Sequence, residues 1–390
     1  MSLRRRPLLA AAALTVLPRD GASQSDLPRP VPLTIKRDQW AAAVEWRSPI
    51  SAREGFSVAA VEVVRRCDDG VLLLIREEPP RNVDEPAIQH VRLERRDATG
   101  RILWQQPVPG LPGRFGRFRA RYLAGTGSQA SLLVTTFLPF DHRKQAAYGR
   151  VVEVDEASGR MRPLGGIARP RTREWIEDEA IELDGALRLE GGRVALHGGF
   201  GSGPFSWWVA LMRLDGTLLW QTIGPTSAGE VTALRAVPGG FEGSLHIIIA
   251  WPAGAKTGVF RMRFDEAGRV VGSVWIADHI NPLFAPDGSV ISLNEGPPRV
   301  LVIEDRYGRH RSVAALPDNV VLRHRLDDGA LVLIDDDDHD LVVSGDGRSA
   351  IRIERDFRSD TILPDGRIFT TTCAEFDCIT RELALYKRPW

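Results

Sequence analysis

The stretch Ala186–Gly224, ALRLEGGRVALHGGFGSGPFSWWVALMRLDGTLLWQTIG, decides the fold. Its four runs of alternating apolar and polar residues are separated by Gly-Gly, by a glycine-rich segment and by Asp-Gly. Alternation with a period of two is typical of half-buried strands, and such dipeptides favour tight turns. Four antiparallel strands within about 40 residues match one blade of a β-propeller. The stretch therefore predicts a four-stranded blade.

The end of this blade, a glycine turn followed by a strand, recurs along the chain. The glycines recur at intervals of roughly 40 to 60 residues and are Gly100, Gly159, Gly216, Gly268, Gly308 and Gly347. We interpret each as the turn into the outermost strand of a blade, and a three-strand unit follows Asp360. The sequence thus predicts an all-β fold, a seven-bladed β-propeller of four-stranded antiparallel blades, with six or eight blades as alternatives.

The last unit lacks a fourth strand before Trp390, and a segment near the N-terminus has no blade of its own. This segment, DQWAAAVEWRS at Asp38–Ser48, has the composition of a strand. We expect it to supply the missing strand and close the ring, because closure removes exposed sheet edges. Residues 26–390 would then form a single propeller domain.

Residues 1–25 have the layout of an export signal peptide. Three arginines precede the apolar run Pro7–Leu17, and small and polar residues follow it. This order is typical of an export signal, and the run is too short to span a bilayer. The stretch LRRRPLL resembles a twin-arginine signal, so the general and the twin-arginine routes both stay open. We expect a periplasmic or secreted protein with no membrane span.

Charge and cysteine content narrow the classes further. Equal numbers of basic and acidic side chains, 51 each, offer no electrostatic basis for nucleic-acid binding, so we expect no nucleic-acid partner. Cys373 and Cys378 flank four residues of a predicted hairpin, where facing positions allow a disulfide that an oxidising compartment favours. Two free thiols are the alternative. Cys67 is interpreted as a small buried apolar residue.

Two stretches resemble a known family of repeats. DATGRILW, Asp97–Trp104, resembles the repeat of pyrroloquinoline-quinone-type propellers, and LDGTLLW, Leu214–Trp220, is a shortened form of it. The resemblance implies a propeller fold and no residue-level activity. Quinone-dependent dehydrogenases of this type place adjacent cysteines beside the cofactor, and this sequence has no adjacent cysteine pair. We therefore expect no quinone cofactor.

Two glycine motifs that could indicate enzymes fail on their context. GTGSQA, Gly125–Ala130, has the glycine spacing of a dinucleotide-binding turn, but a strand-like run follows where a helix is needed. HGGF, His197–Phe200, resembles an esterase oxyanion loop, but the chain contains no G-x-S-x-G nucleophile motif. We interpret the first as a hairpin turn and Gly198, Gly199, Gly201 and Gly203 as a flexible hairpin loop.

An acidic run, LVLIDDDDHDLVVS at Leu331–Ser344, is a candidate metal site. A calcium loop of the EF-hand type begun at Asp336 fails, because Leu341 and Gly347 stand where Gly and Glu are needed. Another calcium or transition-metal site, with ligands Asp336, Asp338 and His339, stays open. The alternative is a solvated hairpin tip, because neighbouring side chains of an extended segment point in opposite directions. We expect no cofactor apart from this open question of calcium.

Propeller topology gathers several loops on one face. The loops between second and third strands and the connections between blades open on the same side. Loops on a rigid scaffold are the usual place for functional residues. This rim would collect, besides the acidic run, His142, Arg143, Arg171, Arg173, Trp175 and His279.

We expect an exported, monomeric, non-catalytic binding or scaffolding module that takes a protein or a small polar ligand on its loop-rich face. The alternative is an enzyme, a hydrolase or lyase, acting on a small polar or carbohydrate substrate at the propeller mouth. Propellers host many unrelated functions, so the fold alone does not decide between them.

Overall fold

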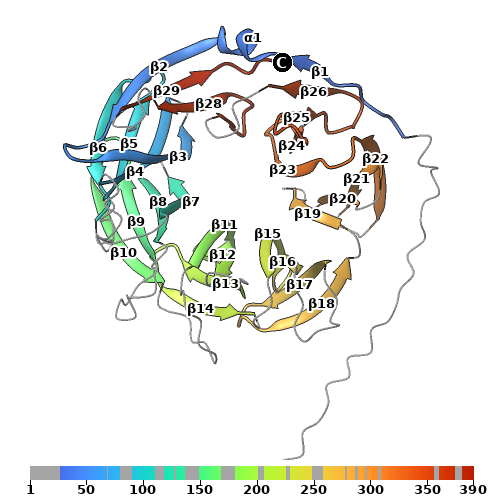
Figure 1. The fold of residues 1–390 in the computed structure, drawn as a ribbon. Coiled ribbons are helices and arrows are strands. Elements are labelled where there is room, and N and C mark those ends of the chain that lie inside the picture. Colours follow the sequence, from blue (N-terminus) through green and yellow to red (C-terminus); the bar gives the residue numbers. More distant parts are fainter. Residues whose placement is uncertain are drawn as a thin grey trace, which may run out of the picture.

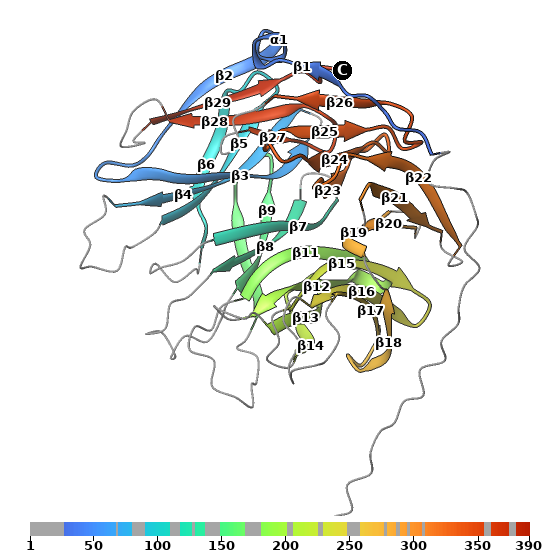
Figure 2. The same ribbon diagram turned by 45° about the vertical axis from the view of Figure 1, so that its right-hand side comes forward.

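The protein folds into a ring of β-sheets (Figure 1 and, turned by 45°, Figure 2). The computed structural model describes residues 27–67, 69–79, 90–109, 118–126, 129–136, 149–167, 181–200, 206–224, 229–247, 258–276, 279–285, 289–294, 297–305, 309–354, 360–373 and 380–390. Over these residues seven sheets form, six with four strands and one with five. The predicted seven-bladed, all-β propeller is confirmed, and within the described residues helix is limited to two short pieces.

In each of the first six blades four consecutive strands pair as an antiparallel meander, with the first strand innermost (Figure 1). Blades 1 to 3 contain β3 (Ser57–Cys67), β4 (Gly70–Glu78), β5 (His90–Asp97), β6 (Ile102–Pro107); β7 (Phe118–Thr126), β8 (Gln129–Thr136), β9 (Gly149–Asp155), β10 (Met161–Ile167); and β11 (Ile181–Leu189), β12 (Arg193–Phe200), β13 (Ser206–Arg213), β14 (Leu218–Ile223). Blades 4 to 6 contain β15 (Gly229–Val237), β16 (Gly240–Ile247), β17 (Gly258–Asp265), β18 (Val270–Ile276); β19 (His279–Phe284), β20 (Val290–Asn294), β21 (Arg299–Glu304), β22 (His310–Leu316); and β23 (Val321–Arg325), β24 (Leu331–Ile334), β25 (Asp340–Val343), β26 (Ala350–Ile353).

Blade 7 closes the ring with strands from both ends of the chain. Its sheet order is β2 (Val44–Ser51), β29 (Thr380–Tyr386), β28 (Ile368–Cys373) and β27 (Asp360–Ile362). The prediction that an N-terminal strand closes the last blade is confirmed. The strand begins later than predicted, because Arg37–Ala41 form the short helix α1. Trp40 anchors this helix with a buried indole, whose Nε1 donates to the Glu354 carbonyl at 2.7 Å.

Buried charges fasten the closing strand to blade 1. Glu94 and Arg96 of β5 are both fully buried, and their Oε1 and Nε atoms lie 2.6 Å apart. Arg96 also donates to the Pro49 carbonyl of β2 at 3.1 Å, and Arg92 donates to the Ser51 carbonyl at 3.0 Å. A buried guanidinium needs such acceptors to compensate its lost hydration. The pair therefore links the interior of blade 1 to the last strand of the ring.

A fifth strand on blade 6 was not predicted from the sequence. β1 (Leu33–Ile35) runs parallel to β26 on the outside of the sheet. Its three residues are too few to show a period, and Leu33 is largely exposed. The backbone upstream also holds to the ring, because the Ala315 N–H donates to the Pro28 carbonyl at 3.0 Å.

The core lies between blades rather than inside one sheet. Within the described residues six buried apolar clusters each join two neighbouring blades. Trp207 and Trp208 of β13 illustrate the arrangement, because they point to opposite faces and join the cores on either side of blade 3. Since both faces of a blade are covered, both tryptophans are buried.

The recurring turn glycines are contact points between blades. Gly100 and Gly159 have φ of +81° and +73°, values that favour glycine. A Cβ on Gly100 would lie 2.6 Å from the ring of Trp46 in blade 7, and one on Gly159 would lie 2.7 Å from Trp104 in blade 1. Each indole lies on the turn of the following blade. The predicted turns at Gly216, Gly268 and Gly347 are also present, and Gly308 lies outside the described residues.

The two glycine motifs have opposite outcomes. β7 ends at Thr126 and β8 begins at Gln129, so the hairpin predicted for GTGSQA is confirmed. Gly198 and Gly199 were predicted in a loop, which is wrong: they belong to β12 and pair with Trp208 and Trp207. Gly201 and Gly203 lie outside the described residues.

Candidate functional site

The acidic run forms a tight hairpin turn between β24 and β25. The Asp335 N–H donates to the His339 carbonyl at 3.0 Å, and the Asp338 N–H donates to the Asp335 carbonyl at 3.1 Å. The Asp335 Oδ1 atom accepts from the backbone N–H groups of Asp337 and His339 at 3.0 and 2.9 Å. Asp335 therefore shapes the turn, as aspartates commonly do. The turn is the tip of the second hairpin of blade 6, as predicted.

The guanidinium of Arg352 in β26 gathers alternate side chains of this turn. Its Nε donates to Asp335 Oδ2 at 2.6 Å, its Nη2 donates to Asp337 Oδ2, and the same Nη2 lies 3.0 Å from His339 Nδ1. Although partial burial opposes it, the hydrogen bonds that Arg352 donates to Asp335 and Asp337 raise the pKa of Arg352 above its usual value. A positive charge is thus already placed between the two carboxylates.

The grouped residues differ from the ligand set that the sequence indicated. Over the described residues, ligand atoms of Asp335, Asp337 and His339 form the one group of three within 4.8 Å of one another. Of the predicted ligands only His339 belongs to it. Asp336 instead accepts from Asn319 Nδ2 at 3.0 Å. Metal binding by Asp336, Asp338 and His339 stays a prediction, and the alternation along the turn explains why odd-numbered residues meet.

Most other predicted rim residues lie outside the described part of the chain. These are His142, Arg143, Arg171, Arg173, Trp175 and Cys378. His279 is the first residue of β19, and its side chain is likewise outside the description. Cys373 ends β28 and is disulfide-bonded. The bond to Cys378 stays a prediction, because Cys378 lies outside the described residues.

His197, the histidine of the HGGF motif, is a buried structural residue. Its Nδ1 lies 2.5 Å from the Val231 carbonyl of blade 4. Burial lowers the pKa of His197 to about 4, so the imidazole is neutral at pH 7 and donates to that carbonyl. A hypothetical Cβ on Gly185 would collide with this ring, which accounts for the glycine opposite it. The contact joins blades 3 and 4.

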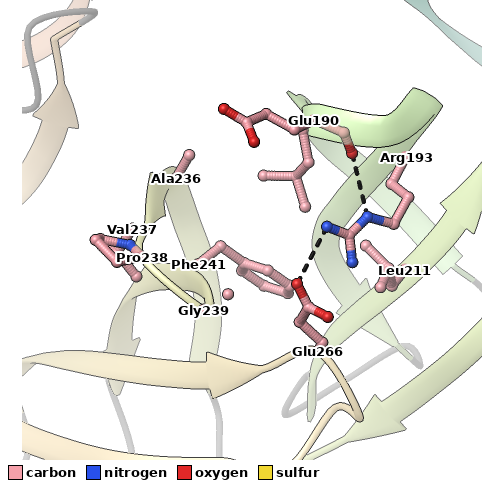
Figure 3. A pocket seen from close by; sticks show the side chains of 11 residues that line it. Glu190, Arg193, Leu211, Ala236, Val237, Pro238, Gly239, Phe241 and Glu266 are labelled. Atoms are coloured by element: carbon pink, nitrogen blue, oxygen red, sulfur yellow. Dashed lines mark hydrogen bonds and ion pairs between the residues drawn. The ribbon is translucent and has the colours of Figure 1, made fainter.

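A pocket of about 380 Å³ lies between the same two blades, on the face opposite the acidic turn. Its walls come from the turn after β11, from the turn Pro238–Gly239 after β15, and from Glu266 in the turn between β17 and β18. In a meander these turns all open on the side away from the second-to-third-strand loops. Figure 3 shows Arg193 joined to Glu266 and to the backbone of Glu190.

No motif in the sequence predicts this pocket. Its turns are readable from EGG at Glu190–Gly192 and PGG at Pro238–Gly240, each a typical turn signal. Their meeting across two blades depends on the ring, which brings residues of different repeats together. An alignment of the turns of consecutive blades is the one sequence comparison that could have indicated that these two turns meet.

Comparisons with known proteins show no family for this chain. No protein-family model and no curated protein matches the chain. Solved structures that resemble it include YCF48 bound to D1 peptide, with a TM-score of 0.43 and 9% identity over 87% of this chain and 94% of that one. The WD40 propeller domain of Doa1 has a TM-score of 0.41 and 13% identity, covering 86% and 99% of the two chains. A putative 6-phosphogluconolactonase from Bacteroides fragilis has a TM-score of 0.40 and 11% identity, covering 82% and 89%.

The described helices include none that is long and apolar enough to cross a membrane.

Proposed function

We propose that this protein is an exported, non-catalytic binding module that recognises a positively charged protein segment through the acidic turn of blade 6. One observation carries the proposal: Asp336, Asp337 and Asp338 are all exposed at the tip of a hydrogen-bonded turn. The side chain of Asp337 is 71% exposed even though it pairs with Arg352. Exposed like charges on a fixed backbone attract a basic partner without reorganisation.

A neighbouring connection extends the acidic surface. Between β22 and β23 the residues Asp318 and Asn319 are exposed, and Asn319 donates to Asp336. This hydrogen bond holds the connection beside the turn. Four exposed aspartates therefore lie close together, and Arg352 neutralises part of the charge of the turn. A Lys- or Arg-rich segment is the partner whose charge complements this surface.

Binding of an oligolysine peptide tests the proposal. The variant Asp318→Asn/Asp336→Asn/Asp338→Asn removes three charges, leaves the partners of Arg352 in place, and keeps a residue that tolerates the left-handed backbone at position 338. At about 0.5 kcal/mol per exposed pair, affinity at low salt should fall about tenfold. Asp327→Asn, at an exposed turn on the opposite face of the same blade, is the matched control and should change it little.

The dependence of oligolysine binding on ionic strength provides a second test. Affinity of the native protein should fall as ionic strength rises, because the charges are exposed. Equal binding by the native protein and the triple variant, or no oligolysine binding at low salt, refutes the proposed function.

Export is proposed on residues 1–25 and has its own test. The full chain, expressed in a bacterial host, should appear in the periplasm with an N-terminus near Ser25. Replacing Arg4, Arg5 and Arg6 with lysine keeps the positive charge, so export by the general route should persist while twin-arginine export should stop. Retention of the unprocessed native chain in the cytoplasm would contradict export by either route.

A further inference from the structure

The pocket between blades 3 and 4 has a fixed apolar wall. Leu189, Leu211, Val237 and Phe241 line it, and Phe241 is 1% exposed. The Phe241 ring stacks on Trp220 at 5.9 Å with an interplanar angle of 5°. It also stacks on Phe264 at 5.2 Å. A volume of about 380 Å³ lies within the range of small-molecule sites. The wall is thus set by packing and does not need a ligand to form.

Among the described residues, one carboxylate at the pocket lacks a counter-charge. Arg193 donates to the Glu190 carbonyl and to Glu266 Oε1, each at 3.2 Å, so its charge is matched by Glu266. The carboxylate of Glu190 has no hydrogen-bond or ion-pair partner among the residues that the structure describes. In Figure 3 it points away from Arg193, toward the side of Ala236. The residual charge of the pocket is therefore negative.

A second arginine near the pocket does not reverse this charge. Arg263 of β17 donates to the Pro238 carbonyl at 2.7 Å. Its neighbour Phe264 faces the pocket side of the blade, packed against Phe241. Successive residues of a strand point to opposite faces, so Arg263 reaches Pro238 from the other side of the sheet.

We propose that this pocket binds a small organic cation, with its ammonium group at Glu190 and an aromatic or branched apolar body between Leu189 and Phe241. The unpaired carboxylate selects the charge and the apolar wall selects the body. Such a division, apolar lining with few polar groups that fix orientation, is usual for small-ligand sites. The site lies on the opposite face from the acidic turn, so it stands or falls independently of the proposed function.

Binding of 2-phenylethylammonium to the full chain, followed by calorimetry and by NMR shifts of the Trp indole protons, tests the proposal. The neutral 2-phenylethanol and the anionic phenylacetate share the ring and differ in charge. We expect saturable binding of the cation, with the alcohol about fivefold weaker because it lacks the ion pair, and the anion weaker still.

Two variants locate the site. Glu190→Gln should weaken binding of the cation about fivefold and leave that of the alcohol unchanged. Ala236→Leu, at an exposed position on the pocket wall, should fill the space and abolish binding of both. Glu153→Gln, at an exposed pair with Arg162 in blade 2, is the charge-matched control and should bind as the native protein does.

Three results overturn the proposal. They are the absence of saturable binding of the cation by the native protein, equal affinity for the cation and the alcohol, and unchanged cation binding in both Glu190→Gln and Ala236→Leu. Circular dichroism of each variant confirms the fold, and because both altered side chains are exposed, neither change removes a core contact.

Discussion

Two turns on opposite faces of the ring share one backbone geometry and serve different ends. In Asp97–Arg101, as in Asp335–His339, the first residue's N–H donates to the fifth carbonyl and the fourth N–H donates to the first carbonyl. In both, the first aspartate's Oδ1 accepts from the third and fifth N–H groups. The fourth residue is left-handed, Gly100 in one and Asp338 in the other.

The difference lies in what covers the fourth residue. Trp46 of the preceding blade packs on Gly100, whereas Asp338 is exposed. The first turn therefore favours glycine for two reasons, its φ and the close indole, whereas the second has only the φ constraint, which aspartate tolerates. A turn that packs against the neighbouring blade has room for no side chain at its fourth residue. A turn that faces solvent can carry a charged side chain there.

Adding a methyl group at Gly100, in the turn that packs on Trp46, should have the largest effect on stability. Gly100→Ala combines left-handed strain with a Cβ 2.6 Å from Trp46, and we expect a loss of about 3 kcal/mol in the free energy of unfolding. Urea denaturation measures it. Gly55→Ala, with φ of +77° and no atom within 4 Å of the new Cβ, isolates the backbone strain and should lose about 1 kcal/mol. Equal losses would mean that the Trp46 contact is unimportant.

Removing the guanidinium from the acidic turn should have the next largest effect. Arg352→Met keeps an unbranched, flexible side chain without the guanidinium and leaves Asp335 and Asp337 to repel each other. Because these groups are partly exposed, we expect a loss of about 1 kcal/mol in the free energy of unfolding at low salt, shrinking as salt is added. Arg348→Met, at an exposed arginine nearby, should lose almost nothing. A salt-independent loss would argue against an electrostatic role.

Calcium titration of the native protein tests metal binding at the acidic turn. Since the Arg352 guanidinium already lies between Asp335 and Asp337, we expect calcium to leave the melting temperature of the native protein unchanged. A calcium-dependent rise that disappears in Asp336→Ala/Asp338→Ala would instead establish a metal site at the predicted ligands.

Exchanging the fourth residues should move stability in opposite directions. Asp338→Gly relieves the left-handed strain of an exposed residue, and we expect a gain of about 0.5 kcal/mol. Gly100→Asp should destabilise at least as much as Gly100→Ala, because the larger side chain meets Trp46. Thermal unfolding of both variants checks the signs, and a loss on Asp338→Gly would show that the aspartate side chain supports the turn.

Among these predictions, acid should have the smallest effect on stability, through the Asp97–Arg101 turn. The hydrogen bond from the Thr99 hydroxyl, with further backbone N–H bonds, lowers the pKa of Asp97 below its ordinary 3.8. A carboxyl whose pKa is lower in the folded state stabilises the protein above pH 4, and this contribution is lost as pH falls through the folded value. Thr99→Ala should raise the pKa of Asp97, which NMR titration of the carboxyl measures. An unchanged pKa would contradict the role of Thr99.

The sequence predicted the repeat but not the contacts between repeats. Glycines followed by strands indicated the blades, and the spare segment Asp38–Ser48 indicated closure. Trp46 carries no local sign that it packs on Gly100, since the two lie in different blades. Likewise, which aspartates face each other depends on the register of the turn. The sequence therefore did not indicate Asp335 and Asp337 as the pair that meets. β1 is too short to show a period, and its parallel partner is remote in sequence.

Ring closure also governs the order in which the chain can assemble. The last pairing joins Val44 to Tyr386 and Ser51 to Thr380, so it cannot form until nearly the whole chain has been made. Closing so long a loop is entropically costly and slow, and until then blades 1 and 7 each expose an unfinished side. Once β2 is in place, no blade can detach from an end, as a terminal repeat of an open solenoid can. The buried Glu94–Arg96 pair binds β2 at that junction. It thus stabilises the closed ring, in which the blades unfold as one cooperative unit.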